Sequence, residues 1–259
     1  MIAIRMSPQG FPMAPSVEEW ERLSPEERSA VVAALPGEVT DAEIAMPEGD
    51  RHFHAKRRVL DALRGYFAKQ RRTVYLAAEL PTYYPAESRF APDLLAVFDV
   101  ADHERDKYVV SAEGKGLDWV LEVHVGGDRK KDAELNVARY AHLGIPEYFL
   151  YDRGRNRLAA YRLPTPAARI YVPIVPQHGR YESTALGLEI EVAEDRLRFF
   201  AGTALLLESE ELIARLEGML ERVTLRAEEE ALRAEGERRR REEAEAEVMR
   251  LRAELERLK

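Results

Sequence analysis

Two carboxylates lie in strand-like segments where an apolar residue would be expected. Asp93 begins the run PDLLAVF, and Glu122 lies inside WVLEVHV, between Leu121 and Val123. A carboxylate in an apolar strand must find a partner, shift its pKa or bind a cation. One such group is explained by solvent or a nearby arginine, whereas two on neighbouring strands of one sheet would converge on a hard cation such as Mg²⁺. The pair therefore predicts a metal site.

A sheet must hold these carboxylates, and the chain contains several short, apolar, β-rich segments. Strands are predicted at residues 73–80, 92–98, 118–125, 147–152, 157–163 and 169–174. A helix is predicted at 130–143, where Gly144 and Pro146 end it. The order of helix, three strands, helix and strand predicts an α/β sheet with helices packed on it.

The segment 51–72 precedes the first strand and is strongly basic. It holds eight Lys and Arg residues and one acid, Asp61, and its apolar stripe predicts a helix. The basic residues on its other faces that would contact a phosphate backbone are Arg57, Arg58, Arg64 and Lys69. The alternative is an ordinary amphipathic helix whose polar face is basic. His52 and His54 lie near its start, but residues two apart on a helix do not share a face, which argues against this pair at the site.

Several short motifs occur in a defined order along the chain. They are Ala91-Pro92-Asp93, Leu121-Glu122-Val123, Asp132, Tyr140, Gly144-Ile145-Pro146-Glu147-Tyr148-Phe149 and Asp152. This set resembles the Uma2-type endonuclease family, also called DUF820, which is grouped with the PD-(D/E)XK nuclease superfamily. The resemblance covers residues 16–163, including the N-terminal motifs Glu18-Glu19-Trp20 and Pro36-Gly37-Glu38. It implies a restriction-endonuclease-like core of order α-β-β-β-α-β, with a mixed sheet flanked by helices.

The resemblance also implies site residues. Asp93 and Glu122 would be ligands of Mg²⁺ or Mn²⁺, with the backbone carbonyl of Val123 as a third oxygen. The superfamily usually has a lysine two residues after the glutamate, and the Uma2 pattern often has it on the following helix, four residues after the aspartate. These positions are His124 and Asn136 here.

Three residues can take the place of that lysine. Lys130 and Lys131 follow the flexible Gly126-Gly127 turn and could reach back to the carboxylates. His124 lies two residues after Glu122 and therefore on the same strand face. It can take up a proton near neutral pH, although a single histidine in a strand is also commonly a core residue with satisfied hydrogen bonds.

The implied reaction is metal-assisted hydrolysis of a phosphodiester bond, with DNA as the substrate. The basic helix would track the phosphate backbone together with Arg153, Arg155 and Arg157, which follow the fourth strand, without reading its sequence. The alternative is a nuclease-fold module with weakened catalysis that binds DNA or assembles through its C-terminal segment. The absence of lysine at both expected positions is the reason for considering this alternative.

Residues 204–259 are charge-dense, with 16 acidic and 12 basic residues. Their apolar heptad positions are Ile213, Leu216, Leu220, Val223, Ala227, Ala234, Ala244, Val248, Leu251, Leu255 and Leu258. Glu230, Glu237 and Arg241 interrupt the middle of this seam. The pattern predicts a long helix that forms a coiled coil, with a parallel homodimer favoured over a trimer, so that two sites could address two DNA strands. A solvated single helix held by Glu/Arg pairs is the alternative.

The composition excludes several classes of protein. The chain of 259 residues has no cysteine, which excludes disulfides, zinc ribbons and cysteine nucleophiles, and no apolar run of the length that crosses a bilayer, so a cytoplasmic location is expected. Its net charge of −8 would by itself argue against a nucleic-acid partner. The charge is unevenly distributed, however, and segment 51–72 is basic. Three parts are predicted: an N-terminal helical segment packed on the core (1–50), a nuclease-like core (51–203) and the charged helix (204–259).

Overall fold

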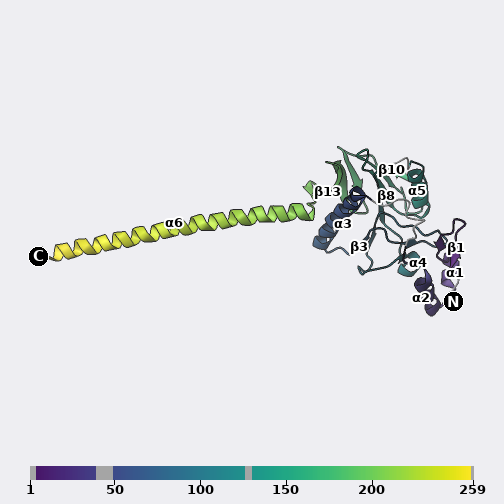
Figure 1. Cartoon of the computed structure of the whole chain (residues 1–259), viewed down its shortest axis with the longest axis horizontal. Coiled ribbons are helices and arrows are strands. Elements are labelled where there is room, and N and C mark those ends of the chain that lie inside the picture. Colours follow the sequence, from purple (N-terminus) through teal and green to yellow (C-terminus); the bar gives the residue numbers. More distant parts are fainter. Residues whose placement is uncertain (1–3, 39–48, 126–129, 258–259) are drawn as a thin grey trace. The chain divides into compact units, whose positions relative to one another are not determined.

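The structure of this chain is a computed structural model that describes residues 4–38, 49–125 and 130–257. The chain divides into two compact units, Met1–Glu208 and Ser209–Lys259. The first unit contains all strands of the described residues, and the described part of the second is a single helix, α6 (Ser209–Arg257) (Figure 1). Among the described residues, no helix combines the length and the apolar character that crossing a membrane requires.

A mixed six-stranded sheet in the order β10-β9-β8-β7-β5-β3 forms the centre of the first unit. Its strands are β3 (Val74–Ala77), β5 (Leu94–Phe98), β7 (Trp119–His124), β8 (Glu147–Asp152), β9 (Arg157–Arg162) and β10 (Val172–Pro173). β7 and β8 are parallel, with helix α5 (Lys130–His142) between them in the chain, and the other neighbours are antiparallel. With α3 (Asp50–Gln70) before β3, the main elements follow the order α-β-β-β-α-β, which confirms the predicted fold class.

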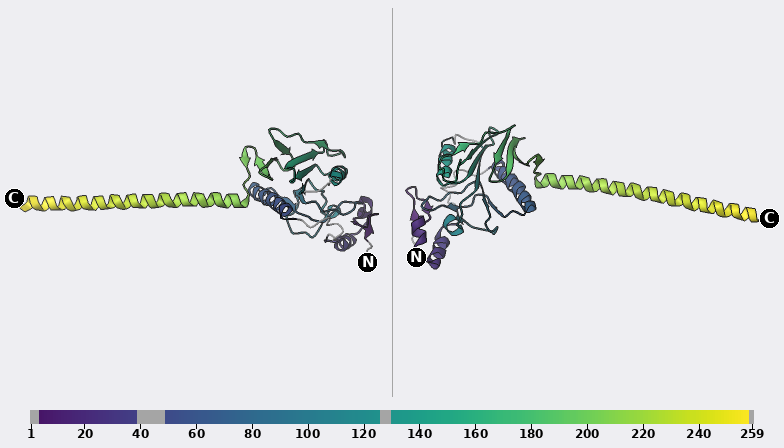
Figure 2. Two further views of the ribbon diagram at one scale, coloured as in Figure 1. Left: turned by 45° about the horizontal axis from the view of Figure 1, so that its top comes forward. Right: turned by 180° about the vertical axis from the view of Figure 1, so that it is seen from behind.

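Helices cover the sheet on both faces, and this explains why its central strands are apolar throughout. On one face, Val59, Leu63 and Phe67 of α3 pack in a core with Trp119 and Phe149. On the other face lies α5 (Figure 2). Its Tyr140 and Val137 belong to a separate core with residues of β5, β7 and β8. Because successive strand side chains alternate, Glu122 lies on the same face as Val120, which belongs to the α5 core.

A second, four-stranded antiparallel sheet follows, which the sequence did not predict. It consists of β11 (Arg180–Ser183), β12 (Leu188–Ala193), β13 (Arg196–Ala201) and β14 (Ala204–Leu205). Its apolar side chains join the α3 core, while Glu189 and Glu191 pair with Arg180 on the other face. The turn between β12 and β13 uses Glu194 and Asp195 at positive φ, where glycine or asparagine is the usual signal.

This sheet also corrects the predicted start of the C-terminal helix. Residues 204–205 are strand β14 and not helix, because they pair with Ala201 and Phe200 of β13. The helix begins at Ser209, five residues later than predicted.

The N-terminal part has two short helices, α1 (Val17–Glu21) and α2 (Pro25–Ala34), after a small pair of strands, β1 (Arg5–Met6) and β2 (Pro12–Met13). Each helix has a capping box, in which Ser16 pairs with Glu19 and Ser24 with Glu27. Three further short elements complete the unit: β4 (Thr82–Tyr83), β6 (Tyr108–Val109) and α4 (Val110–Glu113). Val31 and Leu35 pack against Tyr83 and Val109, so this part contacts the β4–β6 pair.

Candidate active site

The structure brings Asp93 and Glu122 together at one end of the β5–β7 pair. The last paired residues of these strands are Leu94 and Leu121, so Asp93 lies beside Glu122 and Val123. The backbone N–H of Asp93 is 3.4 Å from Oε2 of Glu122, and the N–H of Val123 donates to Oδ2 of Asp93 at 2.7 Å. The N–H and C=O of a strand residue point to the same side, and the carbonyl of Val123 therefore faces Asp93 as well.

Glu122 is held in an electrostatically unfavourable environment. Burial raises its pKa well above the usual range, and the negative charge of Asp93 raises it further. The hydroxyl of Tyr140 from α5 donates to Oε1 of Glu122 at 2.5 Å, which favours the charged form in part. Two carboxylates so close together require either a proton or a cation between them. Oxygen donors of this kind suit Mg²⁺ or Mn²⁺, so the residues present fit the predicted metal.

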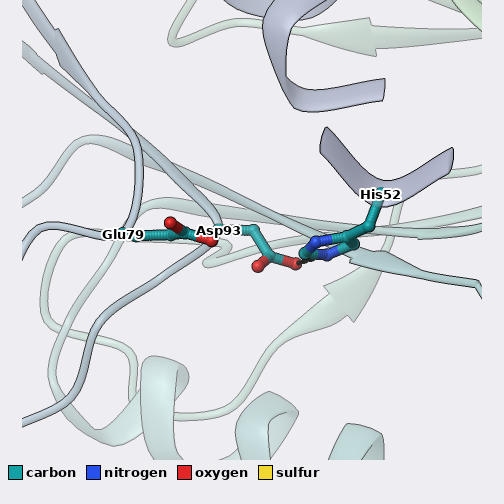
Figure 3. Close-up of side chains that lie close together, drawn as sticks. All are labelled: His52, Glu79 and Asp93. Atoms are coloured by element: carbon teal, nitrogen blue, oxygen red, sulfur yellow. Dashed lines mark hydrogen bonds and ion pairs between the residues drawn. The ribbon is translucent and has the colours of Figure 1, made fainter. Parts of the chain in front are cut away.

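Two residues that the sequence did not assign to the site join Asp93 there. Nε2 of His52 is 3.0 Å from Oδ2 of Asp93, and ligand atoms of His52, Glu79 and Asp93 all lie within 4.8 Å of one another (Figure 3). Glu79 follows β3 at a positive φ of 54°, and its N–H donates to the carbonyl of Pro92 at 3.0 Å. Asp93 is therefore common to the carboxylate pair and to this His–Glu group.

His52 and His54 do not both face the site, as expected for residues two apart on a helix, but His52 alone does. His54 is exposed, while the side chain of His52 is 12% exposed and faces the sheet. His52 alone therefore reaches Asp93. Because the two residues lie 41 positions apart in the chain, no local sequence pattern indicated their contact.

Lys56 is the only lysine among the described residues that is buried. It lies one helical turn after His52, and its ammonium pairs with the carboxylate of Glu79. The pair thus holds a positive charge next to the His52–Glu79–Asp93 group. A buried lysine among carboxylates is a common feature of functional sites.

His124, Lys130 and Lys131 were the candidates for the missing lysine. His124 is half-buried on the same face as Glu122 and is paired in register with Asp152 of β8. Lys130 and Lys131 begin α5, but their side chains, like the Gly126-Gly127 turn, lie outside the described residues.

The basic residues predicted to contact DNA are spread over a larger area than the carboxylates. On α3, Arg57 pairs with Asp61 at 3.5 Å and Arg58 with Glu208 at 3.6 Å. Arg64 donates to the carbonyl of Leu76 at 3.2 Å. Arg64 and the exposed Lys69 lie about 18 and 26 Å along the helix from His52 at 1.5 Å per residue. After β8, Arg155 pairs with Asp152, whereas Arg153 donates to the carbonyl of Arg51, next to His52.

Comparison with known proteins identifies the family. Residues 17–193 match the Uma2 family, described as "Putative restriction endonuclease", and the chain belongs to this family. This confirms the resemblance that the sequence motifs indicated. No curated protein matches the chain significantly. Among solved structures, it is similar to a "putative nuclease belonging to DUF820" from Anabaena variabilis, with 14% identity and a TM-score of 0.42 over 54% of this chain and 75% of that chain.

The hydrogen bond between Tyr140 and Glu122 gives a first testable prediction. Replacement of Tyr140 by Phe removes the hydroxyl that orients Glu122. Loss of a hydrogen bond to a metal-binding carboxylate typically weakens metal binding at least tenfold, so we expect the affinity for Mn²⁺ to fall about tenfold in titration calorimetry. Tyr171→Phe is the matched control, since it loses a comparable hydrogen bond to the carbonyl of Ile145. Equal Mn²⁺ affinities in the two variants would reject the role of Tyr140.

Proposed function

We propose that this chain is a Mg²⁺- or Mn²⁺-dependent DNA endonuclease that hydrolyses phosphodiester bonds at the Asp93–Glu122 site. The proximity of these two carboxyl groups carries the proposal, because burial and the negative charge of Asp93 disfavour the doubly charged pair without a cation. A divalent cation compensates both charges. Membership of the Uma2 family supports phosphodiester hydrolysis among the reactions open to such a site. We also propose a cytoplasmic location for this enzyme.

Each residue of the site has a distinct part in this proposal. The groups that would bind the cation are the carboxylates of Asp93 and Glu122, the carbonyl of Val123 and the imidazole of His52. When bound, the cation polarises a phosphoryl oxygen and lowers the pKa of an attacking water. Tyr140 orients Glu122 through its hydrogen bond, and Glu79 holds the ammonium of Lys56.

Positive side chains would offset the negative charge that grows on the phosphate during hydrolysis. Lys56 has the best-supported position, because the ion pair with Glu79 keeps it beside Asp93 and His52. His124 remains a candidate on the face of Glu122, and Lys130 and Lys131 remain candidates at the start of α5.

DNA would be held by basic side chains that contact phosphates rather than base edges. Arg153 would contact the phosphates nearest the site, because its side chain reaches the start of α3. The other proposed contacts are Arg57, Arg58, Arg64, Lys69 and Arg155. Arg64 is about 18 Å from His52 along the helix, which corresponds to about five base pairs of B-DNA at 3.4 Å each.

A plasmid assay tests the proposed function directly. Purified full-length protein should convert supercoiled plasmid to nicked or linear forms with Mg²⁺ or Mn²⁺, and excess EDTA should stop the reaction. Salt-sensitive DNA binding without metal-dependent cleavage would instead support the alternative, a nuclease-fold module with weakened catalysis.

Lys56 gives the second prediction. Replacement of Lys56 by Met should lower the cleavage rate about a hundredfold, because one charge-stabilising donor is lost, while calorimetry should show Mn²⁺ binding that is unchanged or tighter. Lys107→Met is the control, since Lys107 donates to the carbonyl of Leu35 in the N-terminal part. A Lys56→Met protein that is folded and cleaves at the wild-type rate would show that another residue has this role.

We also propose that the chain is a homodimer formed through α6. No described residue of this helix is buried, although apolar residues recur along it at heptad spacing. A lone helix with such a seam has no core to pack on.

A further inference from the structure

The seam of α6 is exposed over its whole described length. Half or more of the residue is exposed at Leu220 (67%), Val223 (63%), Leu251 (51%) and Leu255 (61%), all on the predicted heptad positions. Residues of the other helix faces pair within the helix, as Arg239 does with Glu243 at 3.1 Å. Some of the outer charges are therefore paired within the helix, whereas the apolar seam is exposed.

A parallel, in-register dimer would place like charges in its own core. In that arrangement each seam residue faces its own copy. Glu230 would meet Glu230, Glu237 would meet Glu237, and Arg241 would meet Arg241 of the second copy. Three such layers in the middle of the seam oppose the parallel pairing.

An antiparallel dimer centred on Arg239 removes these conflicts. In an antiparallel coiled coil, each first heptad position packs against a fourth heptad position of the partner helix. The layers formed with the second copy are then Val223 with Leu255, Ala227 with Leu251, Glu230 with Val248, Ala234 with Ala244, and Glu237 with Arg241. Each layer occurs twice by symmetry. The central acidic and basic residues become partners, and the alanines allow the helices to approach closely.

The residues that flank the seam also place opposite charges together in this arrangement. In this register Arg226 faces Glu254, and Arg233 faces Glu247, of the second copy. Only the middle places like charges together, at Arg238 and Arg240. There Arg238 already pairs with Glu242 of its own helix at 3.3 Å, which reduces the repulsion.

We infer that α6 binds a second copy of this chain as an antiparallel coiled coil, with reciprocal Glu237–Arg241 layers at its centre. The inference rests on the proposed homodimer and replaces the parallel arrangement that heptad spacing alone suggested. Ser209 lies 30 residues from the centre, so the two copies of Ser209 are about 90 Å apart at 1.5 Å per residue. The two cores would thus be joined to the coiled coil at points about 90 Å apart.

Cysteine cross-linking tests the direction of the helices, because the chain has no cysteine of its own. In the full-length protein, the double variant Ala234→Cys with Ala244→Cys should form a covalent dimer on mild oxidation. Neither single variant should do so, because its two thiols would be offset by ten residues, or about 15 Å, which no disulfide spans. Cross-linking of the single variants would overturn the antiparallel arrangement while leaving the dimer intact.

A charge exchange provides a matched test without new thiols. By sedimentation equilibrium, Glu237→Arg and Arg241→Glu should each raise the dimer dissociation constant about tenfold or more, because each turns two attractive layers into repulsive ones. The combined exchange should restore it to within about threefold of wild type. Single variants that dimerise like the wild type would reject these layers, and a monomeric wild-type protein would overturn both the dimer and the inference.

Discussion

Asp93→Asn is expected to abolish DNA cleavage, lowering the rate about a thousandfold or more, since a bound cation contributes several kcal/mol to stabilisation of the transition state. Asparagine has the shape of aspartate, and its amide oxygen can still accept the N–H of Val123. It lacks the charge that would bind the cation jointly with Glu122 and His52. The substitution therefore removes the charge needed for metal binding while it keeps the local structure.

The experiment measures plasmid nicking and Mn²⁺ binding on the same protein samples. Asp99→Asn is the matched control, because Asp99 follows β5 at the other end of the strand from Asp93, is exposed and has a positive φ that asparagine tolerates. It should cleave and bind metal like the wild type. If Asp93→Asn retained the nicking activity of the wild type, that activity would have to come from elsewhere, and the proposed site would be rejected.

The largest loss of stability is expected for Glu147→Ala, about 3 kcal/mol in the free energy of unfolding. Glu147 begins β8 and is 1% exposed. Its oxygens accept hydrogen bonds from Ser183 Oγ at 2.5 Å, from the N–H and hydroxyl of Thr184 at 2.9 and 2.7 Å, and from Arg162 at 3.1 Å. This carboxylate links the six-stranded sheet to the end of β11, and alanine would leave the buried hydroxyl of Ser183 and the partly buried donors of Thr184 and Arg162 without this acceptor.

Urea denaturation followed by circular dichroism measures this loss. Glu182→Ala is the control, since Glu182 also approaches Arg162, at 3.9 Å, but its side chain is 68% exposed. That change should stay within about 0.5 kcal/mol of the wild type. Glu147→Gln should fall between the two because the amide can keep part of the network. Equal effects of Glu147→Ala and Glu182→Ala would show that the buried network contributes little.

Elements with a local pattern were predictable from the sequence. The apolar runs of β5, β7 and β8 and the stripe of α3 appear where they were expected, because burial on both faces of a strand or on one face of a helix leaves a periodic trace within a few residues. The proximity of Asp93 and Glu122 was also expected, because each interrupts such an apolar run on neighbouring strands. β12 and β13 were missed although the alternation of apolar and charged residues in β12 is typical of a half-buried strand, and the turn between them lacks the glycine that usually indicates a hairpin.

The sequence alone determined that this chain has an α/β core with two carboxylates in it, because strand periodicity and charged interruptions are short-range properties, while the family motifs indicated that this core resembles a nuclease. The tertiary structure decided which other side chains meet them. His52, Lys56 and Glu79 come from α3 and from the loop after β3, and nothing in their local segments marks them as neighbours of Asp93. Their convergence depends on how α3 packs across the sheet, which is a property of the whole core and not of any one segment.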